Sequence, residues 1–266
     1  MSSPFAGQSA LVCGGAGGLG GATARRLAGL GMCVVIFEPD ADRAGAFAQA
    51  LGPLAVAVAG SHSDDDAIRR AIDVARRIGD FRLCVNAAGV AINSPAMADA
   101  NGVPHDLDVF KQMLDLHLMG PFNVSRLCAA AFAANEPDGD GGRGLIVNTA
   151  STAAYDGQAR QVAYAAAKGA IVSMTTALAR DLAEIGVRAN AIAPGPILTP
   201  RLAAAPEAIK VALTANVAFP KRCGDADEYA SLVEAMIRTP FLNGQTIRLD
   251  GGLSTPLTTF AAAPRL

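Results

Sequence analysis

The sequence predicts a doubly wound α/β fold, a single Rossmann-type domain whose seven-stranded parallel sheet is covered by helices on both faces. Short apolar runs alternate with longer amphipathic runs along the chain. The strand-like runs are separated by helix-like ones, as parallel strands with crossover helices require. A glycine-rich turn joins the first apolar run to the first helical one, which is typical of a nucleotide-binding α/β domain.

The first half of the chain contains four of the predicted strands. Residues 9–13 form a buried strand, and a helix over 19–30 follows the glycine-rich turn. Residues 32–37 (MCVVIF) are rich in β-branched side chains and predict the second strand. A helix over 41–50, a strand over 54–59, a helix over 64–78 with acidic residues in its first turn, and a strand over 83–86 complete this half.

The second half continues the alternation. Two helices are predicted over 107–119 and 122–134, followed by the loop EPDGDGGRG and a strand over 145–149. A long helix over 161–184 precedes a strand over 187–193. Helices over 204–216 and 226–237 and a last strand over 245–249 end the pattern. No internal repeat or linker-like stretch interrupts it, so we expect one domain over residues 1–266.

Composition excludes several classes of protein. Hydrophobic residues make up 51% and charged residues 17%, which suits a large buried core. The net charge of −2 argues against a nucleic-acid partner, which needs a basic face. No apolar run approaches the ~18 residues of a membrane span, and the first residues lack the features of a signal peptide. We therefore expect a cytoplasmic protein with no membrane partner.

The five cysteines are scattered and odd in number. No CxxC motif or Cys/His cluster is present, so no metal site is expected. Reduced, buried thiols are the expected state in a cytosolic protein.

The run CGGAGGLG, residues 13–20, predicts a phosphate-binding turn. Glycines permit a tight turn and a close approach of the backbone to a pyrophosphate, and the following helix presents unpaired N–H groups to the anion. The run fits two templates, Gly15-x-Gly17-x-x-Gly20 and Gly14-x-x-x-Gly18-x-Gly20. It therefore predicts a dinucleotide site without choosing between families.

Glu38 points to the identity of the dinucleotide. It ends the second predicted strand, 18 residues after Gly20, where a carboxylate can accept hydrogen bonds from the adenosine ribose hydroxyls. The same carboxylate repels a 2′-phosphate. The cofactor is therefore predicted to be NAD rather than NADP.

Ser151, Tyr164 and Lys168 form the predicted catalytic group. Tyr164 and Lys168 lie four residues apart on one predicted helix and so share a face. Ser151 follows a strand end, at the rim where open α/β sheets bind ligands. A phenol with a pKa near ~10 is a weak base at neutral pH, and a neighbouring ammonium would stabilise its phenolate. Ser151 can hold a substrate oxygen beside the phenol.

Together these residues resemble the short-chain dehydrogenase/reductase family from about Gln8 to Gly252. The matching pieces are the glycine turn, the sequence NAAG at 86–89, Ser151 with Tyr164-x-x-x-Lys168, Pro194-Gly195 and the closing IRLDGG. The resemblance implies a parallel sheet in the order 3-2-1-4-5-6-7 and a homotetramer. It also implies an oxidoreductase that interconverts a secondary alcohol and a ketone, with Tyr164 as general base.

Within this family the sequence resembles dehydrogenases of 3-hydroxyacyl-CoA, through segments such as NEPDGDGG and PFLNG. This resemblance implies a small-molecule substrate, (S)-3-hydroxyacyl-CoA oxidised to 3-ketoacyl-CoA, and a role in fatty-acid metabolism. It implies a substrate lid at about 197–220, with Thr199 near the nicotinamide carboxamide. The residues that it places around NAD are Gly14, Gly17, Gly18, Leu19, Gly20, Glu38, Asn86, Ala87, Gly89, Tyr164, Lys168, Pro194, Ile197 and Thr199.

Four residues depart from the family pattern. Cys13 replaces a threonine of the glycine turn, Ala87 replaces a small polar residue, and Gly60 stands where an aspartate contacts adenine. His117 occupies the place of the family's catalytic asparagine, whose main-chain carbonyl holds a water next to the lysine. That carbonyl is present with any side chain. His117 is therefore a candidate catalytic residue that either joins the proton relay through its imidazole or only packs in a helix bend.

Two other functions remain open on the sequence. The same chemistry could act on a steroid, an aromatic alcohol or another secondary alcohol, since the lid sets that choice. Alternatively the chain could bind a dinucleotide without catalysis, an idea that His117 and Gly60 favour and that Ser151, Tyr164 and Lys168 oppose.

Overall fold

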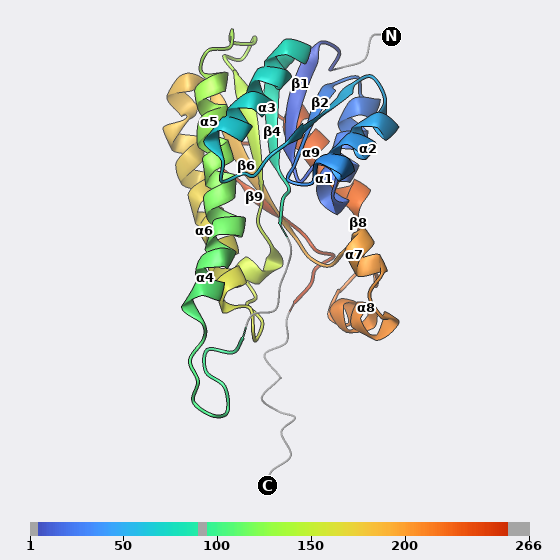
Figure 1. The fold of residues 1–266 in the computed structure, drawn as a ribbon, viewed down its shortest axis with the longest axis vertical. Coiled ribbons are helices and arrows are strands. Elements are labelled where there is room, and N and C mark those ends of the chain that lie inside the picture. Colours follow the sequence, from blue (N-terminus) through green and yellow to red (C-terminus); the bar gives the residue numbers. More distant parts are fainter. Residues whose placement is uncertain (1–4, 90–94, 255–266) are drawn as a thin grey trace.

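The computed structural model describes residues 5–89 and 95–254 and shows a seven-stranded parallel sheet in the order β3-β2-β1-β4-β5-β6-β9 (Figure 1). The predicted fold class and strand order are both confirmed. The strands are β1 (Gln8–Cys13), β2 (Cys33–Glu38), β3 (Ala55–Ala59), β4 (Asp80–Asn86), β5 (Gly144–Thr149), β6 (Val187–Pro194) and β9 (Thr246–Leu249).

Helices cover both faces of the sheet (Figure 1). One layer consists of α1 (Gly18–Gly29), α2 (Ala41–Leu51) and α9 (Ala226–Arg238). The other consists of α3 (Asp65–Ile78), α4 (Leu107–Leu114), α5 (Gly120–Phe132) and α6 (Val162–Asp181). Because successive side chains of a strand point to opposite faces, Leu11 of β1 packs under α3 and α5 while its neighbour Val12 packs under α1 and α9.

The segment that carries His117 differs from its prediction. The predicted helices over 107–119 and 122–134 are one continuous helical rod, in which a π-helical turn, Asp115–Met119, joins α4 to α5. Gly120 and Pro121 predict a break, but the wider turn changes the hydrogen-bond register just before Pro121, whose missing N–H is then tolerated at the start of α5. The rod continues, and His117 lies inside the π-helical turn.

The lid segment also differs. Instead of one helix over 204–216, it contains α7 (Pro200–Ala203) and α8 (Glu207–Thr214), separated at Pro206. A proline disfavours the helical conformation of the residue before it, which explains the break. Two short strands, β7 (Ile197–Leu198) and β8 (Gly224–Asp225), pair at the base of this segment and were too short to predict.

Helix α6 corrects the expectation that no segment has the length and apolar character of a membrane span. By length and composition alone, Val162–Asp181 is such a segment, and about a third of it is buried in this structure. In this fold it packs against α4, β5 and β6 and carries the buried Lys168. The five cysteines are free thiols, of which Cys13, Cys84 and Cys128 are buried, whereas Cys33 and Cys223 are half-buried rather than buried as predicted.

Candidate active site

Ser151, Tyr164 and Lys168 lie together at the carboxyl end of β5. Ser151 follows this strand and caps a short 3₁₀ turn, Thr152–Ala154, where its Oγ accepts a hydrogen bond from the Ala153 N–H at 3.1 Å. Tyr164 and Lys168 are one turn apart on α6, with the Lys168 Nζ 5.8 Å from the centre of the Tyr164 ring. The spacing predicted from the sequence therefore produces one compact group.

Burial controls the proton affinities of this group. It lowers the pKa of Lys168 to about 7, and it raises the pKa of Tyr164, an effect that the Ser151 hydroxyl partly offsets. The sequence suggested that the ammonium would lower the tyrosine pKa. In the structure Lys168 Nζ instead donates to the main-chain oxygen of Thr149 at 2.7 Å, and desolvation dominates both groups.

His117 belongs to the same cluster. Its side chain is buried, and its ring meets the Tyr164 ring edge-on with 5.0 Å between ring centres. A Cβ atom on Gly89 would lie 2.8 Å from the imidazole, so the glycine after β4 leaves room for this side chain. The structure therefore brings all four candidate catalytic residues together.

The glycine turn between β1 and α1 is tightly enclosed. Gly14 has φ +70°, and a Cβ atom there would lie 2.7 Å from the Ala88 Cα. A Cβ on Gly18 would lie 2.6 Å from the Thr199 side chain, and one on Gly20 would lie 2.2 Å from the Gly14 oxygen. These three positions belong to the second template, Gly14-x-x-x-Gly18-x-Gly20. Helix α1 has no side-chain cap, so its first N–H groups are free to face an anion.

Glu38 lies at the end of β2 with its side chain buried. Its Oε1 pairs with the guanidinium of Arg43 on α2, a partner that sequence reasoning missed. Its Oε2 is buried and has no hydrogen-bond partner among the described residues. An orphaned buried carboxylate oxygen costs free energy and fits a ligand that brings hydroxyl donors, as the adenosine ribose of NAD does.

The remaining predicted cofactor residues surround the same edge of the sheet. Asn86 ends β4, and its amide nitrogen faces inward, donating to Asn148, Ser125 and the Pro121 oxygen. This nitrogen therefore braces the elements around the site, whereas the Asn86 Oδ1 is buried with no hydrogen-bond partner among the described residues. Ala87 continues the strand by donating its N–H to the Cys13 oxygen at 3.0 Å. The other positions follow in the chain: Leu19 at the start of α1, Gly89 beside His117, Pro194 at the end of β6, and Ile197 and Thr199 at the base of the lid.

Packing explains why a glycine stands at position 60. The Gly60 N–H donates to the main-chain oxygen of Glu38, and a Cβ atom at this position would lie 2.5 Å from the Ala67 Cβ and 2.8 Å from the Phe37 ring. The family's aspartate would therefore collide with two core residues. The departure reflects the neighbours of position 60 in this chain.

Gly60→Ala should accordingly lower the free energy of unfolding by about 1–3 kcal/mol, because overpacking forces the core to shift. Gly45→Ala is the matched control, since a Cβ on Gly45 in α2 meets no atom within 4 Å and alanine favours a helix interior. Urea unfolding of both variants measures the difference. Equal stability of the two variants would contradict the packing explanation.

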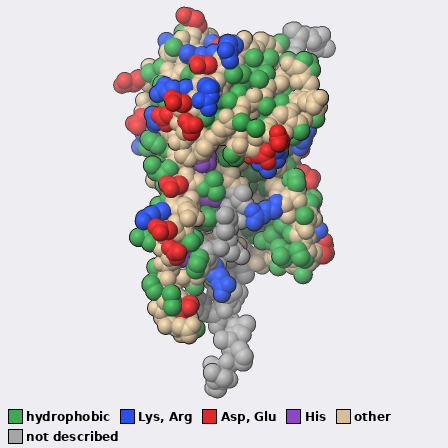
Figure 2. All heavy atoms as spheres, viewed as in Figure 1, with side chains coloured by type: hydrophobic (Ala, Val, Ile, Leu, Met, Phe, Trp, Pro, Cys, Tyr) green, Lys and Arg blue, Asp and Glu red, His purple; other side chains and the backbone are tan. Residues whose placement is uncertain are grey.

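The lid presents apolar side chains on its outer surface. Ile209, Val211 and Leu213 of α8 are exposed, as is Phe219 after the helix. Figure 2 shows hydrophobic side chains gathered over α8 at the lower right. The side chain of Thr199 caps α7 at the foot of this lid and lies against the glycine turn.

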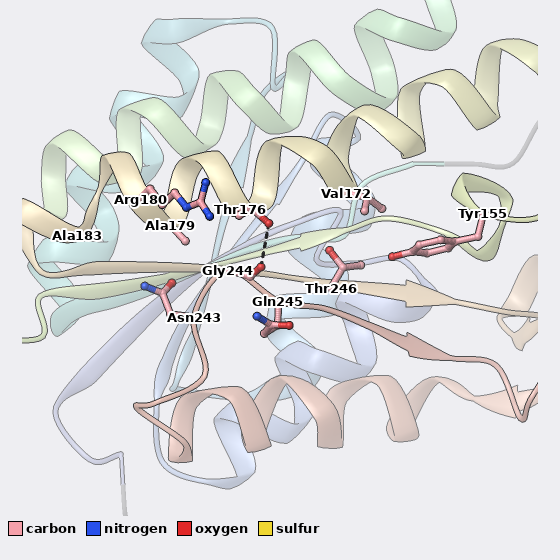
Figure 3. Close-up of a pocket in the computed structure, with 10 residues that line it drawn as sticks. All are labelled: Tyr155, Val172, Thr176, Ala179, Arg180, Ala183, Asn243, Gly244, Gln245 and Thr246. Atoms are coloured by element: carbon pink, nitrogen blue, oxygen red, sulfur yellow. Dashed lines mark hydrogen bonds between the residues drawn. The ribbon is translucent and has the colours of Figure 1, made fainter.

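A separate hollow of about 530 Å³ lies between α6 and the segment 243–246 (Figure 3). It is lined by Tyr155, Thr176 and Arg180 among others, and the Thr176 hydroxyl donates to the Gly244 oxygen at 3.2 Å. None of the predicted catalytic or cofactor residues lines it. Its position beside the edge strand β9 separates it from the catalytic group.

Comparison with known proteins gives one family. The family model described as short chain dehydrogenase matches residues 8–210. The 3-hydroxyacyl-CoA dehydrogenase type-2 of Homo sapiens is 45% identical over 93% of this chain and 95% of its own length.

Two solved structures agree. The 3-hydroxyacyl-CoA dehydrogenase type-2 from Mycobacterium avium has a TM-score of 0.91 at 42% identity, covering 95% of this chain and 98% of its own. A 3-ketoacyl-(acyl-carrier-protein) reductase from Brucella melitensis, solved with NADH, has a TM-score of 0.81 at 27% identity, covering 93% and 98%.

Proposed function

The chain belongs to the short-chain dehydrogenase family and is an oxidoreductase that acts on a CH–OH group, and we propose that it oxidises (S)-3-hydroxyacyl-CoA to 3-ketoacyl-CoA with NAD. The observation that carries the chemistry is the meeting of Ser151, Tyr164 and Lys168 beside the carboxyl end of β5. The choice of a CoA thioester as substrate is supported by the 45% identity to a relative named 3-hydroxyacyl-CoA dehydrogenase type-2. Such an intact group favours an enzyme over a protein that only binds a dinucleotide.

Each residue of the group has a distinct task. Ser151 holds the substrate hydroxyl, Tyr164 accepts its proton, and Lys168 in its ammonium form favours the phenolate. When bound, NAD supplies the acceptor for the hydride. Burial raises the pKa of Tyr164, so proton acceptance depends on positive charge close to the phenol. Lys168, whose pKa of about 7 lets it gain or lose a proton near neutrality, can pass the proton on.

Glu38 supports NAD as the cofactor. Its unpartnered Oε2 can accept from a ribose hydroxyl, whereas a 2′-phosphate in the same place would meet a buried carboxylate. Arg43 pairs with this carboxylate through one guanidinium nitrogen, so part of its positive charge is already balanced by Glu38. Within the family, which binds nicotinamide dinucleotides, this arrangement supports the form without the phosphate.

The test follows NADH absorbance. Purified protein is assayed with acetoacetyl-CoA and NADH, then with NADPH in its place, and then with a panel of steroid, aromatic and aliphatic alcohols and ketones. We expect turnover of the thioester with NADH at a kcat/KM at least about tenfold above that with NADPH. Activity on the panel but not on the thioester would reject the acyl-CoA substrate in favour of another alcohol. A preference for NADPH would reject the proposal that Glu38 favours NAD.

His117→Ala tests the role of the imidazole. The edge-on contact with Tyr164 favours a packing role, so we expect kcat to fall about tenfold as the phenol loses its fixed position, with the shape of the pH profile unchanged. His117→Asn, which keeps a similar shape, should retain most of the activity. A pH profile altered near ~6.5 in both variants would instead assign the proton relay to the imidazole.

We further propose a cytoplasmic homotetramer, the assembly that the family resemblance implies. The edge strand β9 pairs only with β6 among the described residues, and such an edge can accept a second copy. The hollow beside it (Figure 3) and the exposed Met119 and Phe122 on the helical rod offer further contact area. Light scattering of the purified protein tests the assembly.

A further inference from the structure

A buried pair of hydroxyl groups lies directly behind Lys168, and the proposed chemistry does not use it. Thr149 ends β5, two residues before Ser151, and Tyr229 comes from α9 on the opposite face of the sheet. The Thr149 Oγ1 lies 2.8 Å from the Tyr229 hydroxyl oxygen. Tyr229 has no exposed surface, so its hydroxyl is available to the protein interior alone.

The contacts determine which hydroxyl donates. The Thr149 Oγ1 lies 2.6 Å from the main-chain oxygen of Asn86 and donates to it, because a carbonyl can only accept. A hydroxyl has one hydrogen, so Tyr229 must be the donor to Thr149. Burial raises the pKa of Tyr229 to about 12, and the phenol therefore keeps this hydrogen throughout the neutral range. The result is a fully satisfied chain from α9 through the end of β5 to the end of β4.

The side chain of Thr149 takes part in these hydrogen bonds, and its main-chain oxygen contacts Lys168. It accepts the hydrogen bond from Lys168 Nζ at 2.7 Å. Among the described residues no carboxylate forms an ion pair with Lys168, because the ion pairs of this part of the chain involve other arginines and lysines. This carbonyl is therefore the acceptor that orients the amine, and its direction depends on how the last residue of β5 is held.

We propose that Thr149 and Tyr229 are positioning residues for Lys168, which lock the end of β5 so that the Thr149 carbonyl holds the amine beside Tyr164. The role rests on the proposed function only in naming Lys168 as part of the proton path. A backbone carbonyl can rotate when its strand end is released. A buried amine that loses its acceptor favours the uncharged form, since hydrogen bonding to the ammonium is what opposes desolvation.

The titratable groups that the structure places around the amine come from three elements. Tyr164 lies on the same helix, His117 comes from the π-helical turn and packs on Tyr164, and Tyr229 comes from α9 behind Thr149. Tyr164 and Tyr229 both have raised pKa values and stay neutral near pH 7. A shift in the proton affinity of Lys168 after a change at Thr149 therefore reports the lost acceptor.

The experiment compares Thr149→Val, Thr149→Ser and Tyr229→Phe in the full-length protein. Thr149→Val keeps the shape of the side chain and removes the hydroxyl. We expect kcat to fall about tenfold with the Kd for NADH unchanged. The limb of the kcat profile on which activity falls as Lys168 loses its proton should move about one pH unit lower. Thr149→Ser should restore both, and Tyr229→Phe should show a smaller change of the same sign.

Thr175→Val is the matched control. Thr175 is also a buried threonine, on the same helix as Lys168, and its hydroxyl donates to the Ile171 oxygen at 2.7 Å. This variant should leave the pH profile in place. If Thr149→Val also left it in place, or if both valine variants shifted it equally, the positioning role would be refuted.

A second measurement separates this proposal from the choice of substrate. Because burial lowers the pKa of Lys168, this residue should contribute to the pH dependence of the thermal midpoint of the protein without ligand, whatever the enzyme oxidises. Thr149→Val should move the onset of that dependence to lower pH relative to Thr175→Val. A shifted onset without turnover of the thioester would support the positioning pair and reject only the substrate, whereas an unchanged onset would reject the pair.

Discussion

Tyr164→Phe should lower the kcat of alcohol oxidation by about 10²–10⁴-fold, the usual contribution of one general acid–base group, while NADH still binds. Phenylalanine keeps the ring that packs edge-on against His117 and removes only the oxygen that interacts with Ser151. The fold and the glycine turn are untouched. The loss should therefore appear in kcat, with little change in the Kd for NADH measured by fluorescence.

The wild-type profile gives this variant a second signature. Ionisation of the Tyr164 phenol, whose pKa burial raises, should give the wild-type oxidation profile a limb on which kcat rises with pH, distinct from the falling limb set by loss of the Lys168 proton. This rising limb should vanish in the phenylalanine variant. Tyr155→Phe is the control: the chain has three tyrosines, and Tyr155 is exposed with its ring against Arg248. Equal activity of the two variants would remove Tyr164 from the mechanism.

The features that the sequence predicts well are those with a local physical cause. The alternation of Leu11 and Val12 between two cores follows from the two-residue period of a strand. The shared face of Tyr164 and Lys168 follows from the helical period. The glycine turn is predictable because only glycine fits at Gly14 and Gly20. In each case the pattern lies within a few residues.

The features that the sequence does not predict depend on how separate helices and strands pack against each other. Thr149 and Tyr229 are 80 residues apart, and neither belongs to a motif with known spacing. Arg43 lies five residues from Glu38, but nothing local shows that α2 turns it back to that carboxylate. From the sequence, Gly60 indicates a lost cofactor contact, and only the structure shows that Phe37 and Ala67 leave no room for a side chain there. The roles of these residues follow from tertiary contacts that the sequence alone does not reveal.

The charge state of Lys168 is the property that the sequence predicts least well, because it depends on the burial of the amine, which no local pattern reveals. Lys168→Met should abolish the proton path and yet raise the thermal midpoint of the protein without ligand below pH 7. Methionine fills a similar volume without a charge, whereas the wild type must keep an ammonium in a site that lowers its pKa from 10.5 to about 7. The unpaired Thr149 carbonyl opposes this gain in part, by about 1–3 kcal/mol.

The pH dependence isolates the lysine from that constant cost. The folded pKa of about 7 lies below the usual 10.5, so between these values the unfolded chain binds more protons and the stability of the wild type rises with pH. The advantage of the methionine variant should be full below pH 7 and should shrink by about 1.4 kcal/mol for each pH unit above it. Lys111→Met, at an exposed lysine paired with Asp108, should show no such trend between pH 7 and 9. A difference between Lys168→Met and the wild type that stayed constant over this range would mean that Lys168 keeps an ordinary pKa, and that its amine is charged throughout the reaction.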